Sequence, residues 1–398
     1  MKKAAVSCLA LWIVILSICT ALPVRADGIA ALPTGQSVGT ATNNTAALSV
    51  SADCAVLMDA SDGQVLFAQN ATKRHAIAST TKIMTALVAL ENTALEDEIT
   101  VPCEAVGVEG SSIYLYQGER LTMEQLLYAL LLESANDAAT AIAIAVSGSI
   151  DAFADAMNQK AQALSLQNTH FTNPHGLSAQ EHYSSAQDLA ILTAYALKNE
   201  TFAKIVGTYR TQIPLKNGEG VRLLINHNKL LKSYSGMLGV KTGYTKESGR
   251  CLVTAAERDG LRLIAVTLDD PCDWTDHRTM LDYGFSNYEC VQLARVQDCS
   301  VCLPVVGGKE NSITITNQQA LSLTLRRERD PISCTVLAQR FLYAPVVQNA
   351  RIGTAVYYCG SEKIAELPLY AKQACRRAAP SSFWSFVKRM FSASAEAE

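Results

Sequence analysis

A block of helical segments between two groups of strand-like segments is the feature that most limits the fold of this 398-residue chain. The first strands form a predicted hairpin, because Ala55–Met58 and Gln64–Ala68 are apolar-rich runs joined by the turn pair Asp62-Gly63. Three more strand-like runs follow the helical block: Gly236–Gly243, Cys251–Ala256 and Leu261–Leu268. Strands on both sides of a helical block predict an α+β domain with helices packed on an antiparallel sheet.

The helices themselves are predicted from periodicity and from capping residues. Apolar side chains recur at helical spacing from Thr80 to about Leu90. Thr122 and Gln125 have the spacing of a capping box that opens a helix over Met123–Leu132. Further helices are expected over Asp137–Val146, over Asp151–Leu164 and from Ser185 onward.

The character of the chain changes after about Glu289. Short β-rich runs follow one another there without a competing helical period: Ser312–Thr316, Leu321–Leu325, Cys334–Leu337 and Thr354–Tyr358. We therefore expect an α+β domain over residues 51–289 and a small all-β, sandwich-like domain over residues 290–372.

The first 26 residues have the layout of a secretory signal peptide. Lys2 and Lys3 precede a long apolar run, and Val24-Arg25-Ala26 places small residues at the position of cleavage. The alternative is an uncleaved membrane anchor, which begins with the same pattern. Residues 27–50 are rich in Ala, Thr, Gly and Asn and are expected to form a flexible leader.

Residues 373–398 are expected to form an amphipathic tail that associates with a membrane surface. Apolar side chains gather on one face of a helix there and basic residues lie beside them: Phe383, Phe386, Val387, Met390, Lys388 and Arg389. Such a segment favours the interface of a membrane with water. The alternative is a helix that docks on the protein itself.

Composition narrows the classes of partner. The formal charge is −3 and no long basic run is present, so no nucleic acid is expected as a partner. None of the six histidines belongs to a metal-binding motif, and we expect neither a metal nor another cofactor. The 12 cysteines permit disulfides without defining pairs. Cys299 and Cys302 have the spacing of a redox motif or of half a zinc site, but their neighbours favour structural thiols or one bridge.

Ser79-Thr80-Thr81-Lys82 places a hydroxyl and an amine three residues apart at the start of a predicted helix, so both project from one face. A serine hydroxyl is a weak nucleophile until a base removes its proton. A lysine becomes such a base when burial and nearby positive charge lower its pKa. The alternative is a helix-capping serine beside a solvated lysine, which the apolar neighbours Ile77 and Ile83 oppose.

Two further motifs follow in the chain. Ser134-Ala135-Asn136 lies between two predicted helices, where a hydroxyl can relay a proton and an amide can hold a carbonyl. Lys241-Thr242-Gly243 lies on a predicted strand, where an ammonium and a hydroxyl suit a free carboxylate and a glycine permits close approach. As alternatives, Ser134 and Asn136 cap helices, and Lys241 protects a sheet edge. The three motifs together predict a serine acyl-transfer enzyme.

In this order, the motifs resemble those of the serine-type D-Ala-D-Ala carboxypeptidases, which are low-molecular-mass penicillin-binding proteins. The resemblance covers about residues 45–370. It includes five longer stretches: Asn173-Pro174-His175-Gly176-Leu177, His182-Tyr183-Ser184, Asp188-Leu189-Ala190, Asn226-His227-Asn228 and Lys241-Thr242-Gly243-Tyr244-Thr245. It implies the transpeptidase fold of penicillin-binding proteins and β-lactamases for the first domain. Where the family often has Ala-Gly, this chain has Ser248-Gly249.

The resemblance implies a catalytic role for the first two motifs. Ser79 is expected to attack the carbonyl of the penultimate D-alanine and to form an acyl-enzyme, with Lys82 as its general base. Ser134 is expected to help pass the proton to the leaving D-alanine, and Asn136 to hold the peptide group of the substrate.

The third motif is implied to bind the substrate. Lys241 and Thr242 would hold the terminal carboxylate on a strand that ends at Gly243, and the amides of Ser79 and Tyr244 would form the oxyanion hole. The implied substrate is the peptidoglycan stem pentapeptide that ends in D-Ala-D-Ala, with β-lactams as inhibitors that trap the nucleophile. An exported enzyme of this kind is expected at the outer face of the cytoplasmic membrane.

Other functions on the same scaffold are alternatives: a β-lactamase, an endopeptidase or a transpeptidase. A class A β-lactamase needs a glutamate that activates the deacylating water, and no E-x-x-L-N segment lies between Asn136 and Lys241. A catalytically silent cell-wall binding protein is a further alternative, which the intact set of motif residues disfavours.

Overall fold

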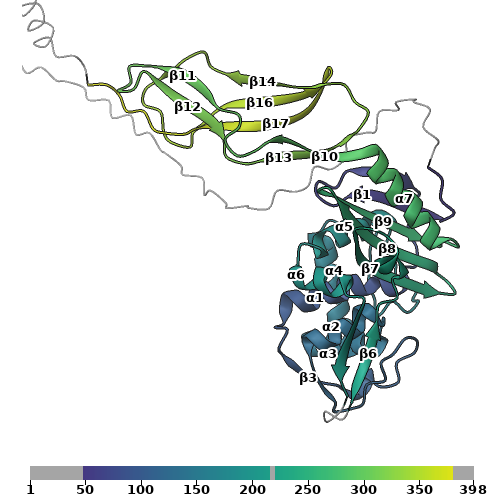
Figure 1. The fold of residues 1–398 in the computed structure, drawn as a ribbon. Helices are drawn as coiled ribbons and strands as arrows, with labels where there is room; N and C mark the ends of the chain where they lie inside the picture. The colour runs from purple at the N-terminus through teal and green to yellow at the C-terminus, as the bar shows by residue number, and fades with distance from the viewer. Residues whose placement is uncertain (1–47, 216–219, 380–398) are drawn as a thin grey trace, which may run out of the picture. The chain divides into compact units, whose positions relative to one another are not determined.

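The computed structural model describes residues 48–215 and 220–379, which are drawn in colour in Figure 1. The predicted signal peptide lies outside these residues, as do nearly all of the leader and most of the predicted tail. In the described part of the chain, no single helix is long and apolar enough to cross a membrane.

A five-stranded antiparallel sheet organises the first domain, in the strand order β2-β1-β9-β8-β7. Its strands are β1 (Cys54–Asp59), β2 (Val65–Gln69), β7 (Met237–Thr245), β8 (Gly249–Arg258) and β9 (Leu261–Leu268). The predicted hairpin and the three later strands are confirmed. Because β1 pairs with β9, the first and last strands of the sheet in the sequence are neighbours in space.

The predicted helices are confirmed with small shifts of their ends: α1 (Lys82–Asn92), α2 (Met123–Leu132), α3 (Asn136–Ser147), α4 (Ile150–Ala163) and α5 (Ala186–Ala196). The capping box is present, since the Gln125 N–H donates to Thr122 Oγ1 and the Thr122 N–H donates to Gln125 Oε1. One expectation was wrong in detail: the helix predicted from Thr80 begins at Lys82, and a 3₁₀ turn, η1 (Ala78–Thr81), precedes it.

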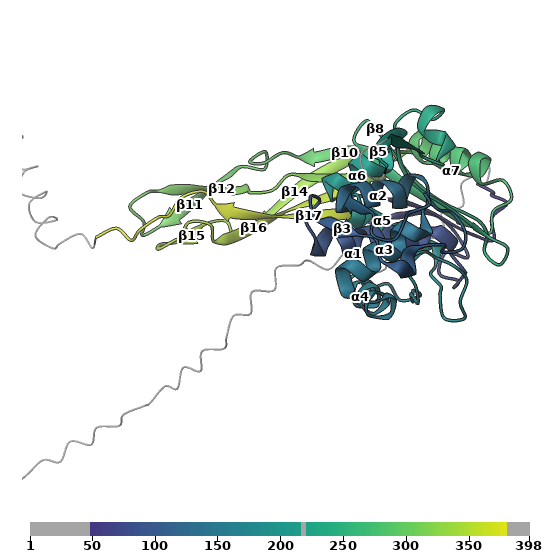
Figure 2. The same ribbon diagram turned by 90° about the horizontal axis from the view of Figure 1, so that it is seen from below.

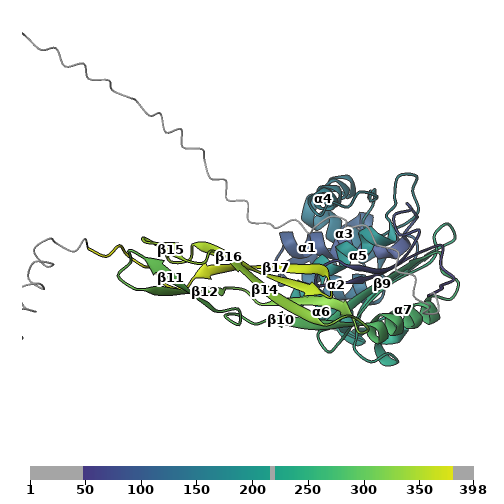
Figure 3. The same ribbon diagram turned by 90° about the horizontal axis from the view of Figure 1, so that it is seen from above.

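Both faces of the sheet are covered, which explains why its strands are almost continuously apolar. Val56 and Met58 of β1 point into the core formed with the helical block, whereas Ala55 and Leu57 point to the opposite core. Helix α7 (Asp273–Asn287) covers this second face, and Figures 2 and 3 show it on the side of the sheet away from α3 and α4.

Several elements were not predicted. Helix α6 (Glu200–Gly207) follows α5, and α7 was also missed because few of its residues are apolar. Two small antiparallel sheets pair β3 (Glu98–Thr100) with β4 (Arg120–Thr122), and β5 (Arg210–Pro214) with β6 (Val221–Ile225). Short 3₁₀ turns, η2 (Cys103–Ala105) and η4 (Lys229–Lys232), lie in the connections.

The C-terminal domain consists of strands, as predicted. A two-stranded sheet pairs β10 (Tyr288–Ala294) with β13 (Leu321–Arg326). A second sheet has the order β14-β16-β17-β12-β11-β15. Its strands are β11 (Val301–Val306), β12 (Ser312–Asn317), β14 (Ile332–Ala338), β15 (Leu342–Tyr343), β16 (Arg351–Cys359) and β17 (Glu362–Ala371). The chain stays paired with this domain beyond residue 372, because the Val346 N–H donates to the Cys375 carbonyl at 2.8 Å.

Candidate active site

Lys82 is the buried centre of the candidate site. Its Nζ lies 3.0 Å from Ser79 Oγ, 2.6 Å from Asn136 Oδ1 and 2.6 Å from the carbonyl oxygen of His175. A neutral amine has two N–H bonds and one lone pair. A protonated Lys82 can donate to all three oxygens, including Ser79 Oγ. In the neutral form, the amide and carbonyl oxygens accept the two N–H groups, and the lone pair is left to accept from the hydroxyl of Ser79. This arrangement suits a lysine that acts as a base.

The surroundings of Lys82 favour its neutral form. Burial is the main cause that lowers the pKa of Lys82 well below its usual range, and the positive charge of Lys241 lowers it further. The carboxylate of Asp137 opposes these effects. A side chain with no exposed surface cannot recover the lost hydration, so the neutral amine is available at lower pH than in an ordinary lysine.

The turn that carries Ser79 is strained. Ala78, which precedes it, has a φ of +44°, a conformation that residues with a side chain rarely adopt. Thr81 Oγ1 donates to the Ala78 carbonyl at 2.8 Å and so holds the turn. Ser79 is partly exposed, in contrast to the buried Lys82, so its hydroxyl can be reached from solvent.

The loop that contains Gly176 supports this turn from the other side. A Cβ on Gly176 would overlap the carbonyl oxygen of Ala78 and would lie 2.9 Å from Thr81 Oγ1. Asn173 Oδ1 accepts the Gly176 N–H at 2.7 Å, which closes the loop. The His175 carbonyl that accepts from Lys82 belongs to the same loop. The stretch Asn173–Leu177, one of those in which the sequence resembles the carboxypeptidases, therefore shapes the site with its backbone.

His182 fixes the orientation of Thr81. The Thr172 N–H donates to His182 Nδ1 at 3.1 Å, so Nε2 carries the proton and donates to Thr81 Oγ1 at 2.8 Å. Burial lowers the pKa of His182 to about 4, which keeps the ring neutral near pH 7. Thr81 accepts from His182 and is free to donate to Ala78.

The second motif places its two polar side chains at the junction of α2 and α3. Ser134 is buried and has a φ of +61°, and Asn136 is the first residue of α3. The Asn136 Nδ2 donates to the Glu109 carbonyl at 2.5 Å, so its Oδ1 is the atom that faces Lys82. The Asn136 N–H donates to the Ser111 carbonyl at 2.7 Å.

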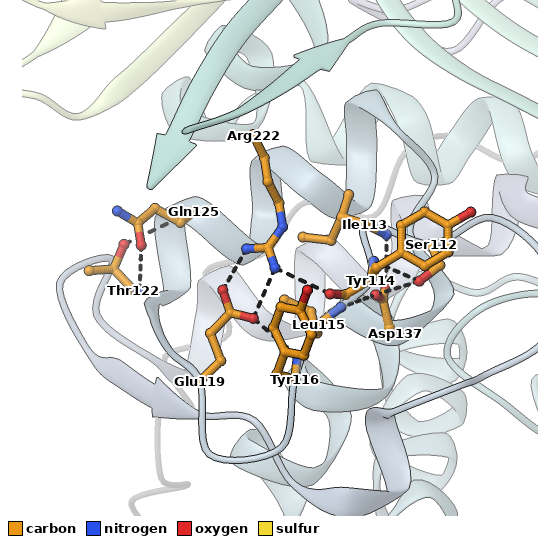
Figure 4. Close-up of polar contacts among 10 residues, drawn as sticks. All are labelled: Ser112, Ile113, Tyr114, Leu115, Tyr116, Glu119, Thr122, Gln125, Asp137 and Arg222. Atoms are coloured by element: carbon orange, nitrogen blue, oxygen red, sulfur yellow. Dashed lines mark hydrogen bonds and ion pairs between the residues drawn. The ribbon is translucent and has the colours of Figure 1, made fainter. Parts of the chain in front are cut away.

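The carbonyls of Glu109 and Ser111, which accept from Asn136, belong to a loop that leads to β4. Two buried carboxylates hold this loop, as Figure 4 shows. Asp137 accepts from Ser112 Oγ at 2.6 Å and from the Leu115 N–H at 3.0 Å. Glu119 forms two contacts with the guanidinium of Arg222, at 2.5 and 3.0 Å. These anchors were not predicted. The only sequence signal for them is the position of Asp137 directly after Asn136.

The third motif lies on β7. Lys241 is buried, and burial lowers its pKa to about 7 although the carboxylate of Glu133 opposes the change. Its Nζ donates to the Thr242 carbonyl at 2.9 Å. A Cβ on Gly243 would lie 3.0 Å from the backbone nitrogen of Ser79, so this glycine lets β7 run close to the backbone of Ser79. Gly243 was expected from the sequence to allow close approach of the substrate. In the structure, Gly243 also allows close approach of β7 to the turn that carries Ser79.

The structure therefore brings most of the predicted site residues together. Lys82 contacts Ser79 and Asn136, and Gly243 lies against the backbone of Ser79. Ser134 and Lys241 lie two positions from Asn136 and Gly243 in the chain, and Thr242 and Tyr244 flank Gly243. The side chain of Tyr244 is exposed.

Glu133 was also missed by the sequence interpretation. Its carboxylate accepts the Ile225 N–H at 2.5 Å and lies 3.4 Å from His227 Nε2. Glu133 directly precedes Ser134, so these contacts connect the second motif to the end of β6 and to the turn that precedes β7. Among residues 48–215 and 220–379, no group of three or more His, Cys, Asp or Glu side chains is arranged to hold a metal ion.

Comparison with known proteins identifies two families along the chain. The profile of the D-alanyl-D-alanine carboxypeptidases matches residues 40–272, and that of the C-terminal domain of penicillin-binding protein 5 matches residues 291–377. The chain is 35% identical to the D-alanyl-D-alanine carboxypeptidase DacF of Bacillus subtilis, over 87% of this chain and 90% of that protein. It is 30% identical to DacA of Escherichia coli, over 81% and 83% respectively.

Solved structures agree with this result. Penicillin-binding protein 5 of Haemophilus influenzae superposes with a TM-score of 0.72 at 27% identity, over 85% of this chain and all of that one. The D-alanyl-D-alanine carboxypeptidase DacD of Francisella tularensis superposes with a TM-score of 0.65 at 26% identity, over 86% and 98%. The predicted α+β fold with a C-terminal β domain is confirmed. The chain belongs to the D-alanyl-D-alanine carboxypeptidase family of serine peptidases.

Proposed function

We propose that this chain removes the terminal D-alanine from peptidoglycan stem pentapeptides, with Ser79 as the nucleophile and Lys82 as the general base. The observation that carries the proposal is the set of three contacts of Lys82 Nζ. In the neutral form of Lys82, two oxygens occupy its N–H groups, so its lone pair is directed at the hydroxyl that must lose a proton. Membership of the carboxypeptidase family supports the class of reaction. The contacts of Lys82 support its assignment as the base and that of Ser79 as the nucleophile.

Acylation follows from this geometry. Ser79 Oγ attacks the carbonyl carbon of the penultimate D-alanine while its proton moves to Lys82 Nζ. The negative charge that develops on the carbonyl oxygen is stabilised by the backbone N–H groups of Ser79 and Tyr244. The proton then passes through Ser134 to the nitrogen of the leaving D-alanine, and the C–N bond breaks.

Hydrolysis of the acyl-enzyme reverses these roles. A water molecule gives a proton to Lys82 as its oxygen attacks the ester carbon, and Ser79 Oγ leaves with that proton. The shortened peptide is released, and both side chains return to their starting forms. The same attack by Ser79 on a β-lactam carbonyl opens the ring and leaves no separate leaving group to depart, which accounts for inhibition.

Recognition of the substrate is assigned to Asn136, Lys241 and Thr242. Asn136 Nδ2 has a second hydrogen beside the one donated to Glu109, and this hydrogen is available to a peptide carbonyl. Lys241 and Thr242 hold the terminal carboxylate. Burial lowers the pKa of Lys241 to about 7 in the free protein. A bound carboxylate stabilises the protonated form of Lys241 and so raises this pKa.

We further propose that the enzyme acts outside the cytoplasmic membrane. Residues 1–26 serve as an export signal, residues 27–50 as a leader and the part of the predicted tail after Ala378 as a membrane-associating segment. The division into a catalytic domain over residues 51–289 and a β domain from residue 290 belongs to the same proposal. The β domain extends past its predicted end at residue 372, because the backbone stays paired with it as far as Ala378. Deleting residues after Ala378 should release the exported protein from membranes and leave its activity unchanged. Unchanged fractionation of the deletion variant would contradict the role of the tail.

The direct test of the function is release of D-alanine from a diacetylated tripeptide that ends in D-Ala-D-Ala. The purified protein should release one D-alanine per peptide, and penicillin should abolish the release. An otherwise identical peptide that ends in L-Ala-L-Ala serves as the control for specificity. Rapid turnover of penicillin without release of D-alanine would instead indicate a β-lactamase.

A further inference from the structure

Exposed apolar side chains gather on the outer face of β11 and β15 in the C-terminal domain. Val306 of β11 and Tyr343 of β15 are partners in the register of these strands, so both side chains project from the same face. The ring of Phe341 meets that of Tyr343 edge-on, with the ring centroids 5.4 Å apart. All three side chains are exposed, and Tyr343 keeps 70% of its surface. We call Val306, Phe341 and Tyr343 the apolar patch.

The strands that carry the apolar patch are apolar on both faces. Val305 and Leu342, their neighbours in the chain, belong to the core of the domain. The outer face of such a sheet is normally polar. Strand β17 of the same sheet has this usual pattern, since its exposed residues are Glu362, Lys363 and Glu366. An exposed apolar group that interrupts a polar surface marks a place of interaction.

Basic residues border the apolar patch. The Lys309 N–H donates to the Arg376 carbonyl at 2.8 Å, which places the last described residues beside the end of β11. Arg377 Nε donates to the carbonyl of Ala344, the residue after the patch, at 3.1 Å. Arg340 directly precedes the patch in the chain. The side chains of all four basic residues are exposed.

The local charge differs in sign from that of the whole chain, whose formal charge is −3. Glu310 is the one acidic residue in three segments at this end of the domain, 304–310, 340–347 and 372–379. The basic residues of the same segments are Lys309, Arg340, Lys372, Arg376 and Arg377. An apolar surface with a basic border suits a partner that is apolar inside and anionic at its surface.

The described chain also ends at the apolar patch. The Ala378 N–H donates to the carbonyl of Gly307, the residue after Val306, at 2.9 Å. Figure 2 shows β11 and β15 next to the segment in which the coloured chain ends. The predicted membrane-associating face begins at Phe383, five residues after Ala378, and five residues span at most about 18 Å. A membrane that holds the tail is therefore within reach of the apolar patch.

We propose that the apolar patch lies on an anionic lipid surface and gives the exported protein a membrane contact in addition to its tail. The rings of Phe341 and Tyr343 enter the interface, where the Tyr343 hydroxyl stays at the level of the headgroups. Lys309 and Arg376 attract the phosphates of anionic lipids. One weak signal gives reversible binding and two give stable anchoring, so the patch strengthens attachment by the tail without replacing it. The inference depends on the proposed location outside the cytoplasmic membrane and not on the catalytic mechanism.

Two other occupants could cover the same surface: a second copy of the chain and the tail of the same chain. In a symmetric dimer the same surface meets itself, so Lys309 and Arg376 of the two copies would repel one another. The aromatic part of the tail carries Lys388 and Arg389, which would meet like charges as well. An anionic lipid surface complements the charge of the border, and for this reason we favour it.

Quenching of tryptophan fluorescence by lipid tests the position of the apolar patch. After removal of residues 1–26, the full chain keeps two tryptophans, Trp274 and Trp384 of the tail. Trp384→Phe removes the fluorophore of the tail and keeps an aromatic ring. In this background, Tyr343→Trp places a reporter in the patch. Ser361→Trp is the matched control, because this exposed residue precedes β17, whose ten residues separate it by about 30 Å from the end of that strand.

The vesicles contain equal parts of phosphatidylcholine and phosphatidylglycerol, with or without acyl chains brominated near the headgroup. Brominated vesicles should quench the Tyr343→Trp reporter at least about twofold more strongly than the Ser361→Trp reporter, because only the first enters the interface. Trp384 of the wild type reports on the tail in the same vesicles. Quenching of Trp384 without quenching of the Tyr343→Trp reporter would keep the role of the tail and overturn that of the patch.

Sedimentation with the unbrominated vesicles measures how much the patch contributes to affinity. The double variant Phe341→Ser/Tyr343→Ser should bind about tenfold more weakly, since two apolar side chains no longer leave water. Arg376→Gln should bind about fivefold more weakly, as expected for one basic residue near an anionic surface, and vesicles of phosphatidylcholine alone should abolish this difference. Lys363→Gln on β17 removes the same charge away from the patch and should bind like the wild type. Circular dichroism and the unfolding midpoint establish that each variant is folded.

Three results would overturn the proposal. The first is unchanged affinity of the folded Phe341→Ser/Tyr343→Ser variant. The second is a dimer in solution that this variant loses, which would assign the patch to a second copy. The third is a buried Tyr343→Trp reporter in the absence of vesicles, which would assign the patch to the tail. Labelling by penicillin is measured separately on each variant, so a failure of the proposed catalytic function is distinguished from a failure of this inference.

Discussion

Gly176 packs directly against the carbonyl oxygen of Ala78, the residue that precedes Ser79. Ser79, the proposed nucleophile, is therefore held by a neighbouring loop as well as by its own turn. Ala78 has a left-handed backbone that is unfavourable for an alanine, and such a conformation persists only where its surroundings impose it. The contact explains why a loop without catalytic side chains is part of the site.

Gly176→Ala should impair acylation more than it impairs folding. The new methyl group would overlap the Ala78 carbonyl and shift the turn that carries Ser79, and displacement of a nucleophile by about 1 Å costs on the order of 100-fold in rate. The rate of labelling by fluorescent penicillin measures the effect.

Gly63→Ala is the matched control for this variant. Gly63 also has a left-handed backbone, with a φ of +77° against +88° for Gly176, but nothing lies within 4 Å of its Cβ position. Both variants carry the conformational cost of alanine at positive φ, and only Gly176→Ala adds the overlap. Equal labelling rates in the two variants would contradict the supporting role of Gly176.

Lys82→Ala should reduce acylation by about 10²–10⁴-fold, the range expected for loss of a general base. In the wild type, the acylation rate should rise with pH as Lys82 loses its proton. Since burial and Lys241 lower the pKa of Lys82, this rise should be complete well below pH 10. The pH dependence of penicillin labelling tests this. A rate that rises only at the pH of an ordinary lysine would exclude the buried amine as the base.

Substrate binding should be accompanied by proton uptake above pH 7. The pKa of Lys241 is about 7 in the free protein, so at pH 8 most molecules must bind a proton when a carboxylate occupies the site. The apparent affinity for a D-Ala-D-Ala peptide should therefore fall as the pH rises from 7 to 9. Calorimetry in buffers of different ionisation enthalpy measures the uptake.

A peptide whose terminal carboxylate is replaced by an amide is the control for this prediction. It binds without needing the charge on Lys241, so its affinity should be lower and should vary little over the same pH range. Lys241→Gln should remove the pH dependence for the carboxylate peptide as well. If both peptides showed the same pH dependence, Lys241 would not be the carboxylate-binding group.

Asp270→Asn should stabilise the protein at neutral pH. Asp270 is buried with one carboxylate oxygen unpartnered, and its other oxygen accepts from the Cys272 N–H and lies 3.0 Å from Ser51 Oγ. The Ser51 N–H donates to the neighbouring Asp276. Burial is the main cause that raises the pKa of Asp270 to about 6, above the value of about 3.9 for an unfolded chain. The folded state then holds the proton more tightly, so stability falls as the pH rises from about 4 to 6.

The Asp270→Asn variant does not ionise at this position, so its stability should not fall between about pH 4 and 6 as that of the wild type does. Urea unfolding should show a gain of about 1–3 kcal/mol at pH 7, as a shift of about two pKa units implies. The gain should shrink towards pH 4, where Asp270 is protonated in the wild type. Asp155→Asn, at an exposed position, controls for the loss of one negative charge. A gain that is independent of pH would refute the explanation.

The sequence predicted those parts of the molecule that depend on side-chain pattern. Strand β9 is apolar along most of its length because it is covered on both faces, and α2 begins at a capping box that can be read directly. Helix α7 lacks such a pattern, because it buries only a few apolar side chains such as Met280 and Leu281. It was missed for that reason.

The same distinction applies to the site. Ser79, Lys82 and Asn136 were selected from short motifs because the proposed chemistry depends on their side chains. The His175 carbonyl and the glycine at position 176 act through backbone atoms and close approach, which no motif describes physically. Glu133 contacts residues more than ninety positions away, so only the fold could reveal its partners.

The most direct test of the account is the site of covalent attachment of penicillin. The protein is incubated with a labelled penicillin, denatured in acid and digested, and the modified peptide is sequenced by mass spectrometry. The account predicts one equivalent of label, attached to Ser79, and no label in Ser79→Ala, while Ser61→Ala in the β1–β2 turn is labelled like the wild type. Attachment at another residue, or unchanged labelling of Ser79→Ala, would contradict the assignment of the nucleophile.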